Sequence, residues 1–198
     1  RQQSFTQLSY NSSIGHPTSM IRISVLLNNK IRYEKHTFPS EDYALWVNLA
    51  QVSNIISLPE VYLKYRWHSN NLSVQFITRN NNHHLARIAW HEHYLNKSLA
   101  DIQKKFLENG IENWNSVRAG KALITEVLHK KNRSFSKIDP VLYGKLFITQ
   151  WEVGIIKKYG IAGFIYCFCH MGFRKKSKST TFRLAYLLYK QIGKSISK

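Results

Sequence analysis

Residues 39–46 carry a helix start, Pro39-Ser40-Glu41-Asp42-Tyr43-Ala44-Leu45-Trp46. Serine is a favoured N-cap residue, and the two acids that follow it fall in the first turn, where the helix dipole stabilises negative charge. One face then carries recurring apolar residues, which is typical of an amphipathic helix; these are Leu45, Trp46, Leu49 and Val52. The sequence therefore predicts a helix that begins after Ser40 and presents two carboxylates in its first turn.

Short apolar runs bounded by Pro, Asn and Ser surround this helix. Residues 20–27 are interpreted as a strand end that leads into a short helix. Residues 55–58 and 61–67 are interpreted as strands, and alternation along the second strand places Arg66 and His68 on the same side. The first part of the chain is thus expected to mix strands and helices.

Longer helical periodicity with few breakers begins after about Asn80. We place a domain boundary near residues 79–82, so that residues 1–78 form one domain and residues 79–198 a second, mostly helical region. Helices are expected near residues 84–96, 98–108, 115–130 and 141–158.

Positive charge concentrates in the second region. Of the 29 Lys and Arg residues, 22 lie in residues 79–198, which hold only seven of the 11 acids, and no acid follows Glu152. Such a one-sided field attracts phosphate-rich surfaces, either anionic lipid or nucleic acid. Residues 161–173 are almost wholly apolar and aromatic, but they fall short of the roughly 20 residues that span a bilayer. We therefore expect this segment to lie on a membrane surface between basic flanks.

The cysteines and histidines favour structural roles. Cys167 and Cys169 are the only two cysteines and lie one residue apart, which excludes the disulfide framework of a small secreted protein. A reducing cytoplasm is the expected compartment, and both are interpreted as core thiols. The histidines of residues 83–93 lack the H-E-x-x-H spacing of a zinc site and are interpreted as solvated helix residues.

Five pieces of sequence follow one another in the first part of the chain. They read Gly15-His16-Pro17-Thr18-Ser19-Met20-Ile21-Arg22, then Tyr33, then Glu41-Asp42-Tyr43-Ala44-Leu45-Trp46, then Leu58-Pro59-Glu60-Val61-Tyr62-Leu63-Lys64-Tyr65-Arg66-Trp67-His68, and last Leu72-Ser73. The ordered set resembles the second half of the catalytic domain in bacterial family 2 glycosyltransferases, and the resemblance covers about residues 10–75. It implies an α/β fold, namely a partial GT-A-type nucleotide-diphospho-sugar transferase sandwich followed by a mostly α-helical C-terminal region.

The resemblance also implies a reaction. This reaction is an inverting transfer of a sugar from a nucleotide-sugar donor to an acceptor hydroxyl, in the synthesis of bacterial capsule, lipopolysaccharide or a similar surface polysaccharide. The hydroxyl loses its proton as the new bond forms, so a carboxylate within hydrogen-bond reach is required. By resemblance Asp42 is this general base, and Glu41 orients it or contacts the acceptor. The helix dipole alone would also favour acids at both positions.

Five further residues gain roles from the same resemblance. His16, Thr18 and Arg22 match a segment that lines the substrate pocket in relatives. Arg66 would neutralise charge near the nucleotide diphosphate, and His68 would be a metal ligand. In the alternative interpretation these side chains belong to an ordinary turn and an exposed strand face and are only solvated.

The donor side of the family's site has no counterpart in the sequence. The Asp-x-Asp that holds a divalent metal, Mn or Mg, on the nucleotide diphosphate is missing, and Glu34 is the only acid before Glu41. We therefore expect an upstream donor-binding half, and no catalysis by residues 1–198 alone. The expected partners are a nucleotide-sugar donor, a glycan or lipid-linked acceptor, and the anionic inner face of a bacterial membrane, to which the protein would bind peripherally.

Two other classes of protein stay open. A non-catalytic remnant would keep the glycosyltransferase-like sequence for assembly with a partner. A nucleic-acid-binding protein would suit the formal charge of +18 and the interleaved aromatic residues. However, the sequence contains no zinc-finger, basic-zipper or RNA-recognition signature, so we expect no nucleic-acid partner.

Overall fold

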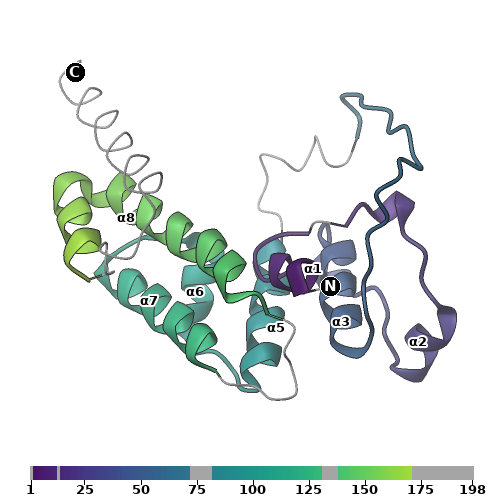
Figure 1. Cartoon of the computed structure of the whole chain (residues 1–198), viewed down its shortest axis with the longest axis horizontal. Helices are drawn as coiled ribbons and strands as arrows, with labels where there is room; N and C mark the ends of the chain where they lie inside the picture. The colour runs from purple at the N-terminus through teal and green to yellow at the C-terminus, as the bar shows by residue number, and fades with distance from the viewer. Residues whose placement is uncertain (1, 13, 72–81, 131–137, 171–198) are drawn as a thin grey trace. The chain divides into compact units, whose positions relative to one another are not determined.

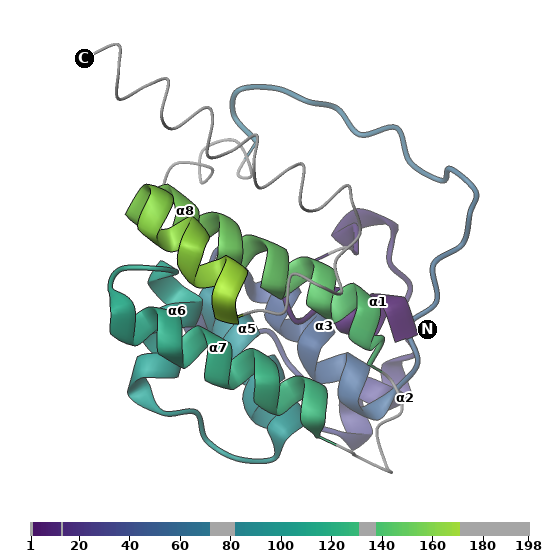
Figure 2. The same cartoon turned by 60° about the vertical axis from the view of Figure 1, so that its left-hand side comes forward.

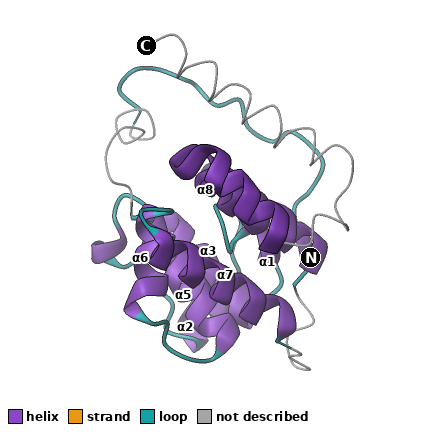
Figure 3. Cartoon of the chain, turned by 90° about the vertical axis from the view of Figure 1, so that its left-hand side faces the viewer, coloured by secondary structure: helices purple, strands orange, loops and turns teal. Residues whose placement is uncertain are grey.

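The computed structural model describes residues 2–12, 14–71, 82–130 and 138–170. Helices and loops make up this part of the chain, and it contains no strand (Figure 3). The α/β sandwich expected from the sequence is therefore wrong. A strand is defined by the neighbour that takes up its backbone hydrogen bonds, and the described residues offer residues 55–58 and 61–67 no such neighbour.

Helices follow one another along the chain (Figure 1). In order they are α1 (Gln2–Gln7), the 3-10 turn η1 (His16–Thr18), α2 (Ile23–Asn28), the 3-10 turn η2 (Lys35–Thr37), α3 (Glu41–Val52), α5 (His83–Leu95), α6 (Asp101–Asn109), α7 (Trp114–His129) and α8 (Pro140–His170).

Periodicity predicted the longer helices well. The helix at Glu41 and the four helices of the second region are confirmed, with ends displaced by a few residues. The helix expected near residues 141–158 continues to His170, across a break at Gly160, whose φ of 56° and ψ of −127° are not helical. The strand end expected within residues 20–27 is wrong, because Ile23–Asn28 is the helix α2.

Contacts between Cα atoms divide the chain into two compact units. The first comprises Arg1–Leu99 and His129–Tyr143, and the second comprises Ala100–Leu128 and Gly144–Lys198. The boundary expected near residues 79–82 falls largely on residues outside the described part, and it stays a prediction.

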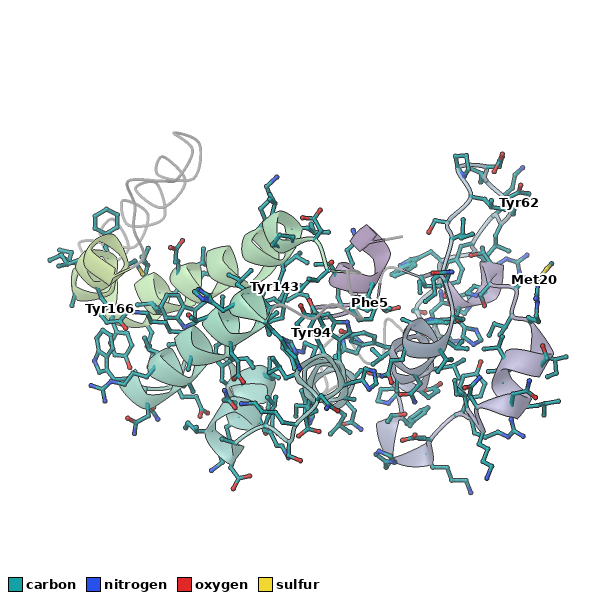
Figure 4. The ribbon with its side chains drawn as sticks, turned by 60° about the horizontal axis from the view of Figure 1, so that its bottom comes forward. Phe5, Met20, Tyr62, Tyr94, Tyr143 and Tyr166 are labelled. Carbon is teal, nitrogen blue, oxygen red and sulfur yellow. The ribbon has the colours of Figure 1, made fainter. Side chains whose placement is uncertain are left out.

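An aromatic cluster forms the core of the first unit. The Trp90 ring of α5 stacks on Tyr94 and Tyr143, with centroids 5.2 and 6.1 Å away, and lies 5.3 Å from Phe5 of α1. The Trp90 indole N–H donates to the Phe5 carbonyl over 3.0 Å, so the buried indole is satisfied. Figure 4 labels Phe5, Tyr94 and Tyr143 of this cluster. The helix α3 packs against α5 and η2 beside it.

Packing of α7 against α8 builds the second unit (Figure 2). The indole N–H of Trp151 donates to the Val117 carbonyl over 3.1 Å. A Cβ added at Gly120 would lie 2.7 Å from the Trp151 ring and 2.8 Å from Phe106, so only glycine fits where the helices approach. None of the helices within the described ranges combines the length and the hydrophobicity that a membrane span requires.

Candidate functional site

A cleft of about 900 Å³ opens in the first unit. Three stretches that are distant in sequence line it: residues between 14 and 25, Trp46 and Leu49 of α3, and residues between 53 and 63. Each of the three stretches overlaps one of the motifs found in the sequence. The fold therefore brings separate motifs to one concave surface.

Hydrogen bonds from side chains to the backbone stabilise the first lining stretch, between residues 14 and 25. The Thr18 hydroxyl donates to the Gly15 carbonyl over 2.8 Å, and the Ser19 hydroxyl donates to the His16 carbonyl over 2.7 Å, which together fix the turn η1. Arg22 follows as the exposed N-cap residue of α2. Of the residues predicted to bind substrate, Thr18 and Arg22 line the cleft.

Trp46 is the buried polar side chain of the cleft. It lines the cleft although only 3% of its surface is exposed, and its buried indole Nε1 has no hydrogen-bond partner among the residues that the structure describes. The His16 ring lies 5.9 Å from the Trp46 ring, and His16 Nε2 is 2.7 Å from the Tyr33 hydroxyl. His16 therefore packs beside the cleft and is not part of its lining. A buried N–H without an acceptor is costly, which makes Trp46 a candidate donor to a ligand.

The two first-turn acids lie outside the cleft lining. Asp42 Oδ1 accepts a hydrogen bond from the Tyr43 backbone N–H over 2.6 Å, and Glu41 Oε2 is buried without a hydrogen-bond partner in the described part of the chain. Ser40 occupies the predicted N-cap position, but its hydroxyl is buried and makes no capping bond. The helix start is thus confirmed, and the capping hydrogen bond is absent.

Asp42 has a histidine neighbour that sequence reasoning missed. The His83 ring of α5 packs edge-on against Tyr43, with centroids 5.6 Å apart. Burial, and then the charge of Arg87, lower the pKa of His83, while the charge of Asp42 acts in the opposite direction. Burial raises the pKa of Tyr43, whose hydroxyl donates to the Leu8 carbonyl over 2.6 Å.

Arg66 and His68 are exposed and do not line the cleft. Asn71 holds the backbone there, because its side chain donates to the Arg66 carbonyl and its N–H to the His68 carbonyl, each over 3.1 Å. Within the described residues, no three His, Cys, Asp or Glu side chains could hold a metal ion. His68 belongs to no such group there, and its role as a metal ligand stays a prediction.

His91 differs from its prediction. It was interpreted as a solvated helix residue, but it is fully buried in the aromatic cluster of the first unit. His91 directly follows Trp90 in α5 and contacts the buried Tyr143. A single amphipathic stripe predicts burial of Trp90 but not of the residue next to it. Cys167 is buried, as expected of a core thiol, and burial raises its pKa to about 11.

Exposed apolar side chains border the cleft. Met20 and Val61 are 99% and 89% exposed, and Ile56, Leu58 and Tyr62 are each more than half exposed. Figure 4 labels Met20 and Tyr62 on this part of the first unit. Alternation had predicted a strand over residues 61–67. The same alternation without a partner strand leaves them in solvent.

Comparison of the chain with models of known protein families, with curated proteins and with solved structures finds no match in any of the three. Function is therefore inferred from the cleft and from the motifs that reach it.

Proposed function

We propose that this chain provides the acceptor-binding portion of a bacterial glycosyltransferase that uses a nucleotide-sugar donor. The observation that carries the proposal is the cleft, where residues from three of the glycosyltransferase-like motifs meet. The cleft holds the sugar acceptor, and Asp42 is the general base that takes the proton from the attacking hydroxyl.

The lining suits a sugar ring. Sugars present hydroxyl groups at their edges and C–H groups on their faces, so they bind where polar donors alternate with aromatic and aliphatic surface. The buried Trp46 N–H and the exposed Arg22 guanidinium supply donors, and Tyr62, from the lining stretch of residues 53–63, supplies an exposed ring. A hydroxyl that accepts from Trp46 would relieve the cost of its buried N–H.

The helical spacing of Asp42 and Trp46 in α3 relates Asp42 to the cleft. Asp42 and Trp46 are four residues apart in one helix, so their side chains lie one turn apart on the same face. Asp42 Oδ1 is engaged by the Tyr43 N–H, while Oδ2 accepts no bond within the described part of the chain. An acceptor anchored at Trp46 and extending one helical turn along α3 would bring a hydroxyl to this oxygen.

Saturation-transfer NMR with a panel of methyl glycosides tests acceptor binding. We expect saturable binding at about 1–10 mM, which is usual for single small ligands with few contacts. Arg22→Ala and Trp46→Phe should each weaken binding at least about fivefold. Trp67→Phe is the matched control, because Trp67 is exposed and does not line the cleft. Binding that survives both cleft substitutions would remove the cleft as the acceptor site.

The protein is further proposed to bind the anionic inner face of the bacterial membrane through α8. Lys157 and Lys158 are exposed, and Ile161 and Ile165, 57% and 55% exposed, follow at helical spacing. Cations beside exposed aliphatic residues favour the headgroup zone of an anionic bilayer. A lipid-linked acceptor would meet the protein at this membrane surface.

Vesicle flotation tests this second part of the proposal. The chain should float with vesicles that contain phosphatidylglycerol and remain below vesicles of phosphatidylcholine alone. Ile161→Asp with Ile165→Asp should reduce flotation, whereas Val141→Asp, at an even more exposed position of α8, should not. Salt-sensitive retention on DNA together with no flotation would instead support the nucleic-acid alternative.

A further inference from the structure

Residues 54–65 form a long loop without backbone pairing (Figure 1). None of their N–H or C=O groups bonds to another backbone group within the described ranges. Their composition is nevertheless that of a strand, because Val, Ile, Leu and Tyr predominate from Ile55 to Tyr65. A stretch of this kind is a template for pairing with another strand.

The side chains alternate between two chemical types. Val61, Leu63, Tyr65 and Trp67 are apolar, and the Tyr65 and Trp67 rings contact each other with centroids 6.2 Å apart. The intervening positions from Glu60 to Arg66 are charged or phenolic. In a strand these two sets would lie on opposite faces.

We propose that residues 59–67 pair in antiparallel fashion with the same segment of a second copy of this chain, with the two-fold axis at Leu63. This register places Glu60 opposite Arg66 and Tyr62 opposite Lys64 on one face, each twice by symmetry. On the other face Leu63 meets its own copy, flanked by pairs of Val61 with Tyr65 and of Pro59 with Trp67. Every cross-strand pair is then ionic, cation–π or apolar.

Neighbouring registers are less complementary. An axis at Lys64 sets this lysine opposite its own copy, and like charges in direct opposition are destabilising. An axis at Tyr62 keeps an ionic pair of Glu60 with Lys64. However, it sets Arg66 opposite Leu58 and Trp67 opposite Ser57, so a charged and a polar residue face apolar side chains. A two-fold axis that lies between two consecutive residues would place each charged or phenolic residue opposite an apolar one. The sequence therefore selects Leu63 as the centre.

The backbone fits the same register. In an antiparallel pair, residues alternate between positions that exchange hydrogen bonds and positions that do not. Pro59 has no N–H and, like Leu63, falls at a position that exchanges no backbone hydrogen bonds with the second strand. The backbone hydrogen bonds between the two strands are therefore made by residues 60, 62, 64 and 66. The Arg66 carbonyl already accepts a hydrogen bond from the Asn71 side chain. Its second lone pair is available for the cross-strand hydrogen bond.

This dimer is independent of the acceptor proposal. Pairing depends on the backbone edge and the cross-strand pairs of residues 59–67, whereas the acceptor site is tested at Arg22 and Trp46; Val61, Tyr62 and Leu63 belong to both surfaces. Loss of sugar binding would therefore not remove the dimer, and a monomeric protein would not remove the acceptor site.

Disulfide trapping tests the register in a background with Cys167→Ala and Cys169→Ala. Leu63→Cys should form a covalent dimer under mild oxidation, because the two copies of residue 63 face each other at a position without hydrogen-bond exchange. Tyr62→Cys and Lys64→Cys are the matched controls and should remain largely monomeric. Efficient cross-linking at either control, or none at Leu63→Cys, would overturn the proposed pairing.

Charge exchange tests the same contact without oxidation. Sedimentation equilibrium of the whole chain should show a dimer, and Glu60→Arg alone or Arg66→Glu alone should weaken it about tenfold or more, since each change breaks two ion pairs. The double variant Glu60→Arg with Arg66→Glu should restore dimerisation to within about threefold. A wild-type chain that stays monomeric at about 100 µM, or a double variant weaker than both single variants, would contradict the proposal.

Discussion

The Tyr143 hydroxyl donates a hydrogen bond to Nε2 of His91 over 3.0 Å inside the first unit. His91 Nδ1 lies 2.7 Å from the Arg87 carbonyl, which can only accept, so Nδ1 carries a proton, and Nε2 is the acceptor as long as the ring is neutral. Burial lowers the pKa of this histidine to about 4. An unfolded chain would protonate the same ring near its ordinary value of about 6.5.

Stability should therefore fall with acid. Because the folded-state pKa lies below the unfolded one, the contribution of His91 is complete above about pH 6.5 and is lost as the pH falls towards 4. We expect the free energy of unfolding to drop by about 2 kcal/mol between pH 7 and pH 5 through this residue. Urea unfolding at both pH values measures this drop.

His91→Gln is the control for that drop, because glutamine keeps a donor and an acceptor but does not titrate. His83 and His93 also have pKa values lowered by burial, and they remain in both proteins. The variant should be less stable at pH 7 and should lose less stability on acidification. Equal losses in both proteins would show that His91 does not carry the effect.

Gly120 should tolerate no side chain. An added Cβ would meet the Trp151 ring at 2.7 Å and Phe106 at 2.8 Å, so Gly120→Ala must displace two large buried rings. We expect a loss of about 1–3 kcal/mol, measured by chemical unfolding. At Gly154 the close atom is Cγ1 of the Ile111 side chain, 2.9 Å away, so Gly154→Ala should cost less. The reverse order would contradict the packing of α7 on α8.

Local patterns predicted the helices because their periodicity is a property of the helix itself. Glu41 and Asp42 mark the start of α3. The four later helices coincide with stretches whose apolar residues recur at helical spacing. The strands failed because a strand depends on a second strand. Alternation from Val61 to Trp67 is compatible with a sheet, but it does not supply the neighbour, and the described residues leave it unpaired.

The site was predicted only in part. Thr18 and Arg22 reach the cleft through a turn that Pro17 and short polar side chains favour locally. Trp46 was placed on the apolar face of its helix, and nothing in sequence spacing shows that its N–H finds no acceptor. The neighbour of Asp42, His83, lies on a different helix, so only tertiary packing brings the two near.

Trp46→Phe should separate binding from stability. The substitution removes a buried N–H that has no partner within the described ranges and keeps most of the aromatic volume, so the two effects on folding offset each other. We expect a change in unfolding free energy within about 1 kcal/mol, measured by urea unfolding. A loss much larger than this would indicate a structural partner for the indole and would weaken its assignment to a ligand.

Asp42→Asn should abolish sugar transfer by a polypeptide that carries residues 1–198 together with a nucleotide-sugar-binding portion. Loss of a general base lowers kcat by about 100-fold or more, while the KM for the donor should change little. Glu34→Gln is the matched control, since it makes the same charge change at an exposed acid outside α3. Retained turnover in Asp42→Asn would remove this residue as the base.

The proton–nitrogen correlation spectrum of the 198-residue chain tests the acceptor cleft most directly, because each of its five tryptophans gives a separate indole N–H signal. Titration with a bound methyl glycoside should shift the Trp46 indole signal, identified by its loss in Trp46→Phe, in a saturable manner. The exposed Trp67 should stay unshifted. A glycoside that binds and leaves the Trp46 signal unchanged would contradict the proposal that this cleft holds the acceptor.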